Sequence, residues 1–195
     1  ISEHIMLALS ELGIQNHFLN RINNREQLIH YLEIIPLEVI VRNVAAGSIC
    51  PRLGLEEGTQ LRNTLVEFCL KNDKLGDPLI SPEHIFTFDW ATPDELAIIV
   101  ENTLRINDFL IGLFLGIGIR LIDFKLEFGR HKIDGETEIM LADEISPDNC
   151  RLWDLKTNKK MDKDRFRRDL GGLIESYEEV AKRLGIKLPQ TKTLN

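Results

Sequence analysis

The segment Leu121–Gly129, with the sequence LIDFKLEFG, alternates between apolar and charged side chains. Side chains two positions apart on a strand share a face and lie roughly 6.5–7 Å apart, so an extended chain here has one apolar and one charged face. The apolar face would carry Ile122, Phe124, Leu126 and Phe128, and the charged face would carry Asp123, Lys125 and Glu127. A solvated antiparallel strand produces the same alternation, so the pattern predicts a strand and leaves the role of its charges open.

A hairpin is predicted directly after this strand. Asp134-Gly135 is a turn signal, and Glu138–Glu144 can form the partner strand. A two-residue turn would place Asp143 opposite Leu126, whereas one extra residue in the turn, or a bulge, would place Asp143 opposite Glu127. Two opposed carboxylates repel unless a cation lies between them, and all-oxygen ligation with few protein donors suits Mg²⁺. We therefore expect the longer turn or a bulge, with a Mg²⁺ site made by Glu127 and Asp143.

Other charged residues surround this expected site. Lys125 could neutralise an anionic substrate or a developing phosphoryl charge, or it could simply keep Asp123 and Glu127 ionised. Asp148 and Arg151 lie in a short loop after the hairpin, where binding residues are common. Alternatively, Asp148 is a turn residue and Arg151 forms a surface ion pair.

Two further stretches could bind an anion. Arg42 is expected to be half-buried on a strand that leads into Ala46-Gly47-Ser48, whose backbone N–H groups and hydroxyl suit a phosphate. Lys71 is placed at the end of another strand. Three arginines lie near the start of a predicted last helix, where cations oppose the helix dipole unless an anion binds nearby. They are Arg165, Arg167 and Arg168, and Asp162, Asp164 and Asp169 are alternative local partners.

The composition is ordinary for a soluble globular protein. The chain has 195 residues, a net charge of −7 and 43% hydrophobic residues. This acidic balance argues against a broad basic surface for nucleic acid. Three widely spaced cysteines suggest neither a disulfide framework nor a zinc site, and reduced thiols in a cytosol fit better. The longest apolar run, 109–119, is too short to span a bilayer.

Helices and strands are mixed along the chain. Helices are predicted over Ile1–Leu12, from a capping box at Thr92 onward, and from Asp162 to Leu184. The last would bury Phe166, Leu170, Ile174, Tyr177, Ala181 and Leu184. Strand-forming segments at 17–19, 27–35 and 37–45 suggest an antiparallel meander, with a further strand at 65–70.

Several of these stretches resemble the SAICAR synthetase family. The similar segments are 34–42 with Ala46-Gly47-Ser48, Leu121–Gly129, Leu141–Asp148 with Arg151–Asp154, and Asp162–Arg167. The resemblance covers residues 1 to about 187. It implies a two-lobed α+β fold, kinase-like or ATP-grasp-like, with antiparallel sheets and packed helices. It also implies an enzyme that uses ATP and Mg²⁺ to join L-aspartate to the carboxylate of the imidazole ribonucleotide CAIR, through an acyl phosphate.

The resemblance assigns roles residue by residue. For ATP it implies Leu32 and Ile34 at the hinge beside adenine, Lys71, and the metal and phosphate residues Glu127 and Asp143. For CAIR it implies Arg42, Ser48, Asp123, Lys125, Asp148 and Arg151, with Arg167 as a further position. Lys125 and Asp123 are the candidate catalytic residues, and the aspartate site is not placed.

One departure from the family affects the expected domains. Family members begin with a β-rich segment containing glycine and lysine that covers the nucleotide, and nothing here corresponds to it. We expect 1–35 to be the remnant of an N-terminal nucleotide-binding lobe, 36–187 the substrate- and metal-binding lobe, and 188–195 a flexible tail. The family also suggests a homodimer. The cysteine usage, the acidic charge and the short apolar run favour a cytoplasmic protein without membrane or nucleic-acid partners. A small-molecule kinase and a non-catalytic nucleotide-binding module are the alternatives.

Overall fold

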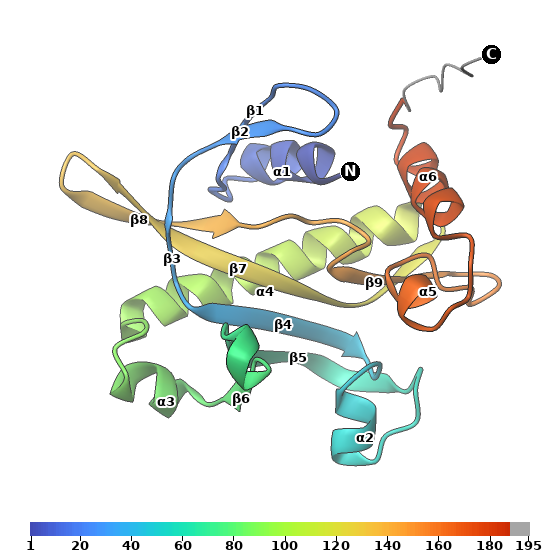
Figure 1. The fold of residues 1–195 in the computed structure, drawn as a ribbon, viewed down its shortest axis with the longest axis horizontal. Helices are drawn as coiled ribbons and strands as arrows, with labels where there is room; N and C mark the ends of the chain where they lie inside the picture. Colours follow the sequence, from blue (N-terminus) through green and yellow to red (C-terminus); the bar gives the residue numbers. More distant parts are fainter. Residues whose placement is uncertain (188–195) are drawn as a thin grey trace.

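The computed structural model describes residues 1–187, so the tail expected at 188–195 lies outside the described residues. A seven-stranded antiparallel sheet and a separate two-stranded sheet carry helices on their faces (Figure 1). The elements in chain order are α1 (Ser2–Glu11), β1 (Phe18–Arg21), β2 (Gln27–Ile29), β3 (Glu33–Ile34), β4 (Leu37–Val44), α2 (Ile49–Leu53), β5 (Gln60–Leu70), a 3₁₀ turn (Asp73–Leu75), β6 (Leu79–Ile80), α3 (Pro82–Thr87), α4 (Pro93–Gly116), β7 (Ile119–Ile133), β8 (Glu136–Ala142), β9 (Cys150–Asp154), α5 (Asp164–Arg167) and α6 (Leu173–Arg183).

Strand β7 organises the large sheet because it pairs with four other strands. It pairs with β3 and β4, and it also pairs with β8 over its second half and with β9 over its first half. The alternating segment of β7 therefore lies inside the sheet. Its charged face is bordered by β4 and β9.

Helix α4 packs along the apolar face of β7 (Figure 1). It begins as predicted at Thr92, whose hydroxyl accepts the Glu95 backbone N–H at 3.2 Å while the Thr92 N–H donates to the Glu95 carboxylate at 2.8 Å. The helix and strand share one core, which includes Ile99, Ile106, Leu110, Phe114, Phe124, Leu126 and Phe128. Each such side chain contributes about 1.5–3 kcal/mol when fully buried, so this core fixes which face of β7 remains polar.

The alternation of β7 is not strict. The pairing of β7 with β9 shifts by one residue between Leu121 and Asp123. An extra residue in a strand turns the preceding side chains to the other face. Ile122 accordingly lies in a small cluster with Val44, Ala46 and Trp153, so its predicted place beside Phe124 was wrong.

The expected longer turn in the hairpin was also wrong. Ile133 pairs with Glu136, which leaves Asp134-Gly135 as a two-residue turn, and Glu127 pairs with Ala142. Both turn residues have positive φ, 50° and 87°, as the tightest hairpin turn requires. Asp143 follows the last paired residue and does not oppose Glu127.

The first strands do not form the predicted meander. β1 and β2 make their own sheet, β3 pairs with β7, and β4 lies between β5 and β7. Local sequence indicated strands near β1 and β4, but the single segment expected at 27–35 is two strands, β2 and β3, in different sheets. Both β3 and β4 pair with β7, which lies far along the chain.

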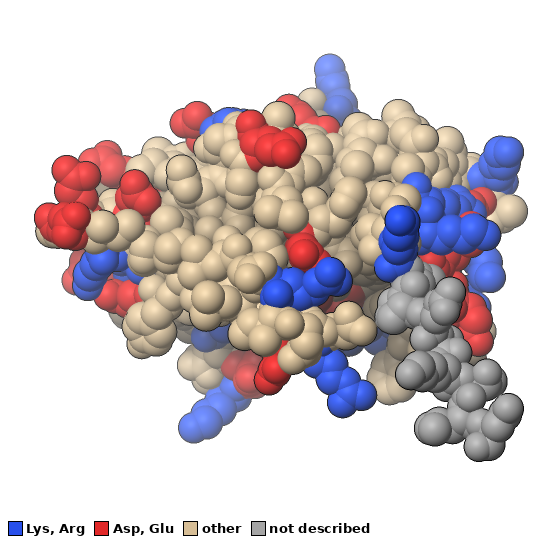
Figure 2. All heavy atoms as spheres, turned by 90° about the horizontal axis from the view of Figure 1, so that it is seen from above, with Lys and Arg blue, Asp and Glu red and all other residues tan. Residues whose placement is uncertain are grey.

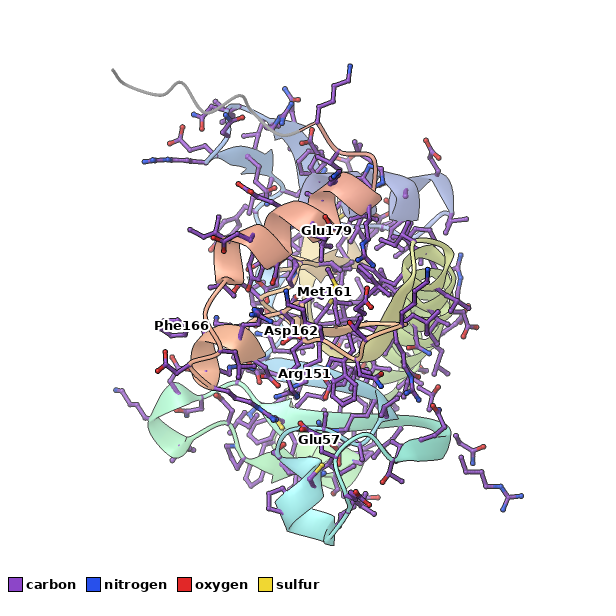
Figure 3. The ribbon with its side chains drawn as sticks, turned by 90° about the vertical axis from the view of Figure 1, so that its right-hand side faces the viewer. Glu57, Arg151, Met161, Asp162, Phe166 and Glu179 are labelled. Atoms are coloured by element: carbon purple, nitrogen blue, oxygen red, sulfur yellow. The ribbon has the colours of Figure 1, made fainter. Side chains whose placement is uncertain are left out.

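The predicted last helix is two helices. Gly171 and Gly172 adopt φ of 62° and 61°, a left-handed conformation that separates α5 from α6. Ala181 and Leu184 are buried as expected, whereas Phe166 and Ile174 are 73% and 71% exposed. Figure 3 shows Phe166 on the outer side of α5. The predicted row of buried apolar side chains was therefore wrong for the residues at the start of the helix and right for those at its end.

The face of the molecule in Figure 2 is mostly uncharged, with its basic and acidic side chains interspersed. None of the helices within residues 1–187 combines the length and apolar composition needed to cross a membrane.

Candidate active site

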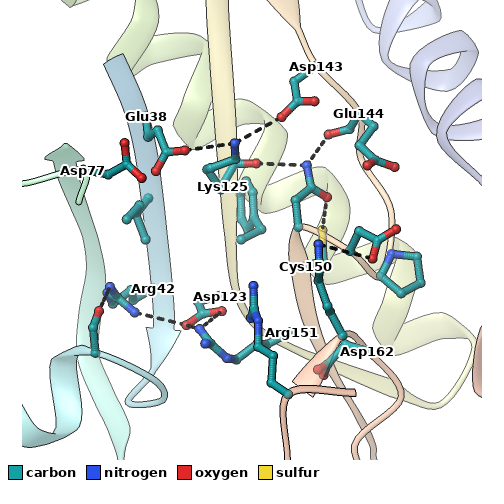
Figure 4. A pocket seen from close by; sticks show the side chains of 18 residues that line it. Glu38, Arg42, Asp77, Asp123, Lys125, Asp143, Glu144, Cys150, Arg151 and Asp162 are labelled. Carbon is teal, nitrogen blue, oxygen red and sulfur yellow. Dashed lines mark hydrogen bonds and ion pairs between the residues drawn. The ribbon is translucent and has the colours of Figure 1, made fainter. Parts of the chain in front are cut away.

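A cavity of about 530 Å³ opens over the charged face of β7 (Figure 4). It lies between β4, the start of α2, the loop after β8 and the segment that leads into α5. Eight residues singled out from the sequence line it: Arg42, Ser48, Asp123, Lys125, Asp143, Asp148, Arg151 and Arg167. Leu32, Ile34, Lys71 and Glu127 do not line it, although Glu127 contacts Lys125 at its edge.

Three neighbouring strands place two arginines around one aspartate. Asp123 pairs with Arg42 on β4 and with Arg151 on β9. The Asp123 carboxylate accepts Arg42 Nη1 at 3.2 Å and Arg151 Nη1 at 2.8 Å. Burial raises the pKa of Asp123, and the two guanidinium groups oppose that rise. Two guanidinium groups, a donor type that suits anions such as phosphate, therefore meet at this one carboxylate beside the cavity.

Arg42 is more buried than predicted, at 2% exposed. Its Nε donates to Glu67 at 2.7 Å and its Nη2 to the Ser48 hydroxyl at 3.1 Å. Glu67 also pairs with Arg52. Sequence reasoning missed Glu67, because only the pairing of β5 with β4 brings it to Arg42.

Lys125 is held among three carboxylates. Its Nζ lies 2.5 Å from Glu127 Oε1, 3.1 Å from Glu38 Oε1 and 3.3 Å from Asp143 Oδ2. Burial lowers the pKa of Lys125, but hydrogen bonds to Glu127 and Glu38 outweigh burial and raise it. The side chain is thus a fixed cation and cannot act as a base near neutral pH.

Glu127 and Asp143 converge without the bulge expected from the sequence. Asp143 has a φ of 60°, a left-handed conformation that aspartate tolerates better than most residues. This turn at the end of β8 brings its carboxylate to the same ammonium group that Glu127 contacts. Lys71 Nζ also reaches Glu127 Oε1, at 2.8 Å.

The donor set fits Mg²⁺ only if a ligand completes it. Within residues 1–187 no three His, Cys, Asp or Glu side chains are grouped so as to hold a metal ion. Mg²⁺ is commonly bound by one or two protein carboxylates, while water and phosphate oxygens fill its remaining coordination positions. Glu127 and Asp143 could hold the ion in this way, beside a phosphate chain.

An apolar patch continues from Glu127 along the same face of β7. Leu32, Met140 and Ala142 form a small buried cluster there. Gly129 makes room for it, since a Cβ on Gly129 would lie 2.7 Å from Leu32 Cβ. The sequence indicated Leu32, but Met140, Ala142 and Gly129 were missed because they depend on the register of β8 and β3.

The loop after β8 presents Asp148 to the cavity. Its backbone N–H donates to the Ser146 hydroxyl, and its carboxylate accepts the Tyr177 hydroxyl at 2.9 Å. Asn149 ties the loop to β7 through the Lys125 carbonyl, at 3.2 Å. Asp148 is therefore both a turn residue and a residue that lines the cavity.

Comparisons with known proteins agree on one family. A family model described as SAICAR synthetase matches residues 1–184. The chain is 65% identical over 186 residues to phosphoribosylaminoimidazole-succinocarboxamide synthase of Pelagibacter ubique (strain HTCC1062), covering 95% of this chain and 72% of that protein. It is 62% identical to the enzyme of the same name from Rhodospirillum centenum (strain ATCC 51521 / SW), covering 95% of this chain and 73% of that protein.

Solved structures match the fold equally well. The phosphoribosylaminoimidazole-succinocarboxamide synthase of Ehrlichia chaffeensis superposes with a TM-score of 0.93 at 47% identity, covering 96% of this chain and 79% of that one. A SAICAR synthetase in complex with ADP gives a TM-score of 0.91 at 44% identity, with the same coverage of 96% and 79%.

Proposed function

The chain belongs to the SAICAR synthetase family, and we propose that the cavity over β7 is where it carries out the reaction of that family. It is an ATP-dependent ligase that joins L-aspartate to the carboxylate of CAIR in purine biosynthesis. The observation that carries the proposed site is the gathering of eight candidate residues from β4, β7, β9, α5 and two loops around one cavity.

We place ATP at the end of the cavity nearest Glu127. The apolar cluster of Leu32, Met140 and Ala142 lies at this end, and Leu32, the most exposed of the three at 8%, would contact the purine ring. Lys71 and Lys125 lie where the phosphates would follow. Glu127 and Asp143 would hold Mg²⁺, which would neutralise phosphate charge when bound. A similar SAICAR synthetase binds ADP, which supports a nucleotide site on this scaffold.

CAIR would occupy the part of the cavity nearer to β9. Arg42, Ser48 and Arg151 surround its phosphate in this proposal, while Lys125 faces the carboxylate. Transfer of the γ-phosphoryl group to that carboxylate gives ADP and an acyl phosphate. The aspartate amine then attacks the acyl carbon, which forms the C–N bond, loses a proton and releases inorganic phosphate. Lys125 stabilises the negative charge that develops on the transferred group, because its own charge is fixed.

The test is ADP release by the full-length protein, with CAIR and L-aspartate omitted in turn. Release of ADP and phosphate should require both, whereas a small-molecule kinase would make a stable phosphorylated product without aspartate. Glu127→Ala and Asp143→Ala should each lower turnover by at least about 10²-fold, because each removes one of the two carboxylates proposed to hold Mg²⁺ beside the phosphates. Glu136→Ala, on the same hairpin and exposed, is the matched control and should stay near wild type. Substantial turnover in either site variant would contradict the assignment.

The assembly and domain expectations remain proposals. We propose a cytoplasmic homodimer, with residues 1–35 in a nucleotide-binding lobe and residues 36–187 in the lobe that binds CAIR. β1 and β2 form a sheet of their own, as a separate lobe would, although α1 and the large sheet share one apolar core. Light scattering on the full-length protein tests the dimer, and a mass equal to one chain would reject it.

A further inference from the structure

Asp164 lies behind the cavity and joins two arginines that line it. It is the first residue of α5, is 2% exposed and does not line the cavity itself. Its Oδ2 accepts Arg151 Nε at 3.0 Å, and its Oδ1 accepts Arg167 Nη1 at 3.1 Å. The two arginines come from β9 and α5, and Asp164 is the group that they share.

The position of Asp164 is itself tightly fixed. Its backbone N–H donates to Asp162 Oδ1 at 2.8 Å, while Asp162 Oδ2 accepts the Leu152 N–H at 2.7 Å. Leu152 is next to Arg151 on β9. Asp162 thus ties the start of α5 to the strand that carries Arg151, and Figure 3 shows Asp162 and Arg151 close together.

This arrangement leaves one edge of Arg151 for a ligand. Nε is bound to Asp164 and Nη1 to Asp123, so two positions of the guanidinium group are clamped. Nη2 donates to no acceptor among residues 1–187 and lies against Gly47, where a Cβ would be only 2.5 Å away. The remaining donor is therefore held beside the Ala46-Gly47-Ser48 turn.

The Asp164 carboxylate lies among cations, most of which have a second carboxylate partner: Arg151 pairs with Asp123, and Lys160 and Arg168 pair with Glu57. Lys160 and Arg168 also approach Oδ2, at 4.0 and 3.7 Å, so one carboxylate faces four cations. Burial would raise the pKa of Asp164, but Arg151 and Arg167 hold it below its ordinary value. The carboxylate remains ionised and keeps Arg151 and Arg167 together at the edge of the cavity.

We propose that Asp164 is a positioning residue for CAIR, because it sets the orientation of Arg151 and the place of Arg167 around the anionic groups of the substrate. The inference rests on the proposed function of the cavity. It differs from the motif-based assignments, which concern side chains that touch the substrate.

The test compares Asp164→Asn with wild type in the full-length protein. Asparagine keeps the volume but removes the charge, and its amide cannot accept both arginines. KM for CAIR should rise about tenfold, and inhibition by inorganic phosphate against CAIR should weaken by a similar factor. KM for ATP should stay within about twofold, since none of the residues proposed for ATP contacts Asp164. Asp164→Glu keeps the charge and should recover part of the loss.

Glu57→Gln is the matched control. Glu57 pairs with Lys160 and Arg168, so the variant breaks ion pairs of the same segment without touching Arg151 or Arg167. It should leave KM for CAIR within about twofold of wild type. An equal rise of KM in Glu57→Gln and Asp164→Asn would show that any disturbance of α5 suffices, and would overturn the proposal.

A double-mutant cycle with Arg167→Gln removes the remaining ambiguity. Arg167 is half exposed, so the change should not affect folding. If Asp164 acts through Arg167, the two changes together should raise KM by less than the product of their separate effects. Fully multiplicative effects would reject the part of the proposal that concerns Arg167, and an unchanged KM for CAIR in Asp164→Asn would reject the inference as a whole. If Asp164→Asn does not fold, Asp164→Glu replaces it in the cycle. Absence of ligase activity in the wild-type protein would instead contradict the proposed function.

Discussion

At the scale of single residues, the fixed charge of Lys125 has a consequence for catalysis. Lys125→Met should lower kcat by about 10²–10³-fold, because it removes a cation aimed at the transferred phosphoryl group. Wild-type kcat should show no loss from Lys125 deprotonation between about pH 7 and 10, because contacts with Glu127 and Glu38 raise the pKa of Lys125. A pH profile of both proteins checks this.

Lys132→Met is the control for this substitution. Lys132 lies on the same strand, pairs with Glu33 and is 66% exposed, well away from the cavity. It should retain wild-type turnover. If wild-type kcat fell at high pH and this fall were absent in Lys125→Met, Lys125 would be titrating. That result would contradict its role as a permanent cation.

Residue motifs predicted the side chains that line the cavity better than those that hold them. Asp123, Lys125 and Arg151 stand in recognisable strings, so they could be named from the sequence. Glu67 could not, because it reaches Arg42 from another strand. Asp164 was weighed only as a local partner of nearby arginines, and its bond to Arg151 depends on how α5 meets β9.

At the scale of elements, the approach of β3 to β7 depends on Gly129. Gly129→Ala would bring a Cβ to 2.7 Å from Leu32 Cβ and 3.3 Å from the Glu33 carbonyl oxygen. Overpacking of this kind costs about 1–3 kcal/mol, so thermal unfolding should shift downward. KM for ATP should rise about tenfold because the apolar patch beside Leu32 moves, whereas KM for CAIR should change less.

Gly112→Ala provides the comparison. Gly112 is in α4 and a Cβ there has nothing within 4 Å, so alanine should stabilise the helix by about 0.5–1 kcal/mol. If Gly129→Ala left both stability and KM for ATP unchanged, the close approach of β3 to β7 would not matter for nucleotide binding.

The hairpin shows why elements are easier to predict than their register. Hydrophobic alternation and Asp134-Gly135 correctly indicated two strands and a turn. They could not reveal the left-handed backbone of Asp143, which brings it to the site in the shorter register. Likewise, apolar spacing continued across Gly171-Gly172, and only the conformation of these glycines separates α5 from α6.

At the scale of the whole molecule, the family and the α+β class were accessible from the sequence, and the comparisons confirm the family. The site draws on Arg42 in one half of the chain and Asp164 in the other. Long-range pairing of β4, β7 and β9 creates this proximity. Motifs identified the family, but the contacts that support the candidate site required the folded chain.

Asp162, whose carboxylate links β9 and α5 through backbone hydrogen bonds, should make the free energy of unfolding depend on pH. Asp162 is 1% exposed, and burial raises its pKa to about 6, despite hydrogen bonds from the Asp164 and Leu152 backbones. Because the folded pKa lies above the unfolded value, the folded state holds a proton that the unfolded state loses between about pH 4 and 6. This group therefore destabilises the fold as pH rises through that window, by about 3 kcal/mol in total.

Urea unfolding of wild type and Asp162→Asn at pH 4 and pH 7 isolates this contribution. Asparagine loses one of the two backbone hydrogen bonds, which lowers stability at both pH values by about 1–3 kcal/mol. Since asparagine cannot ionise, the difference in unfolding free energy between the two proteins should narrow or reverse at pH 7, by about 2–3 kcal/mol relative to pH 4. Other carboxyl groups titrate in both proteins and cancel in the difference. If the difference in unfolding free energy between the two proteins did not change with pH, Asp162 would have the same pKa in the folded and unfolded states. Its burial between β9 and α5 would then carry no electrostatic cost.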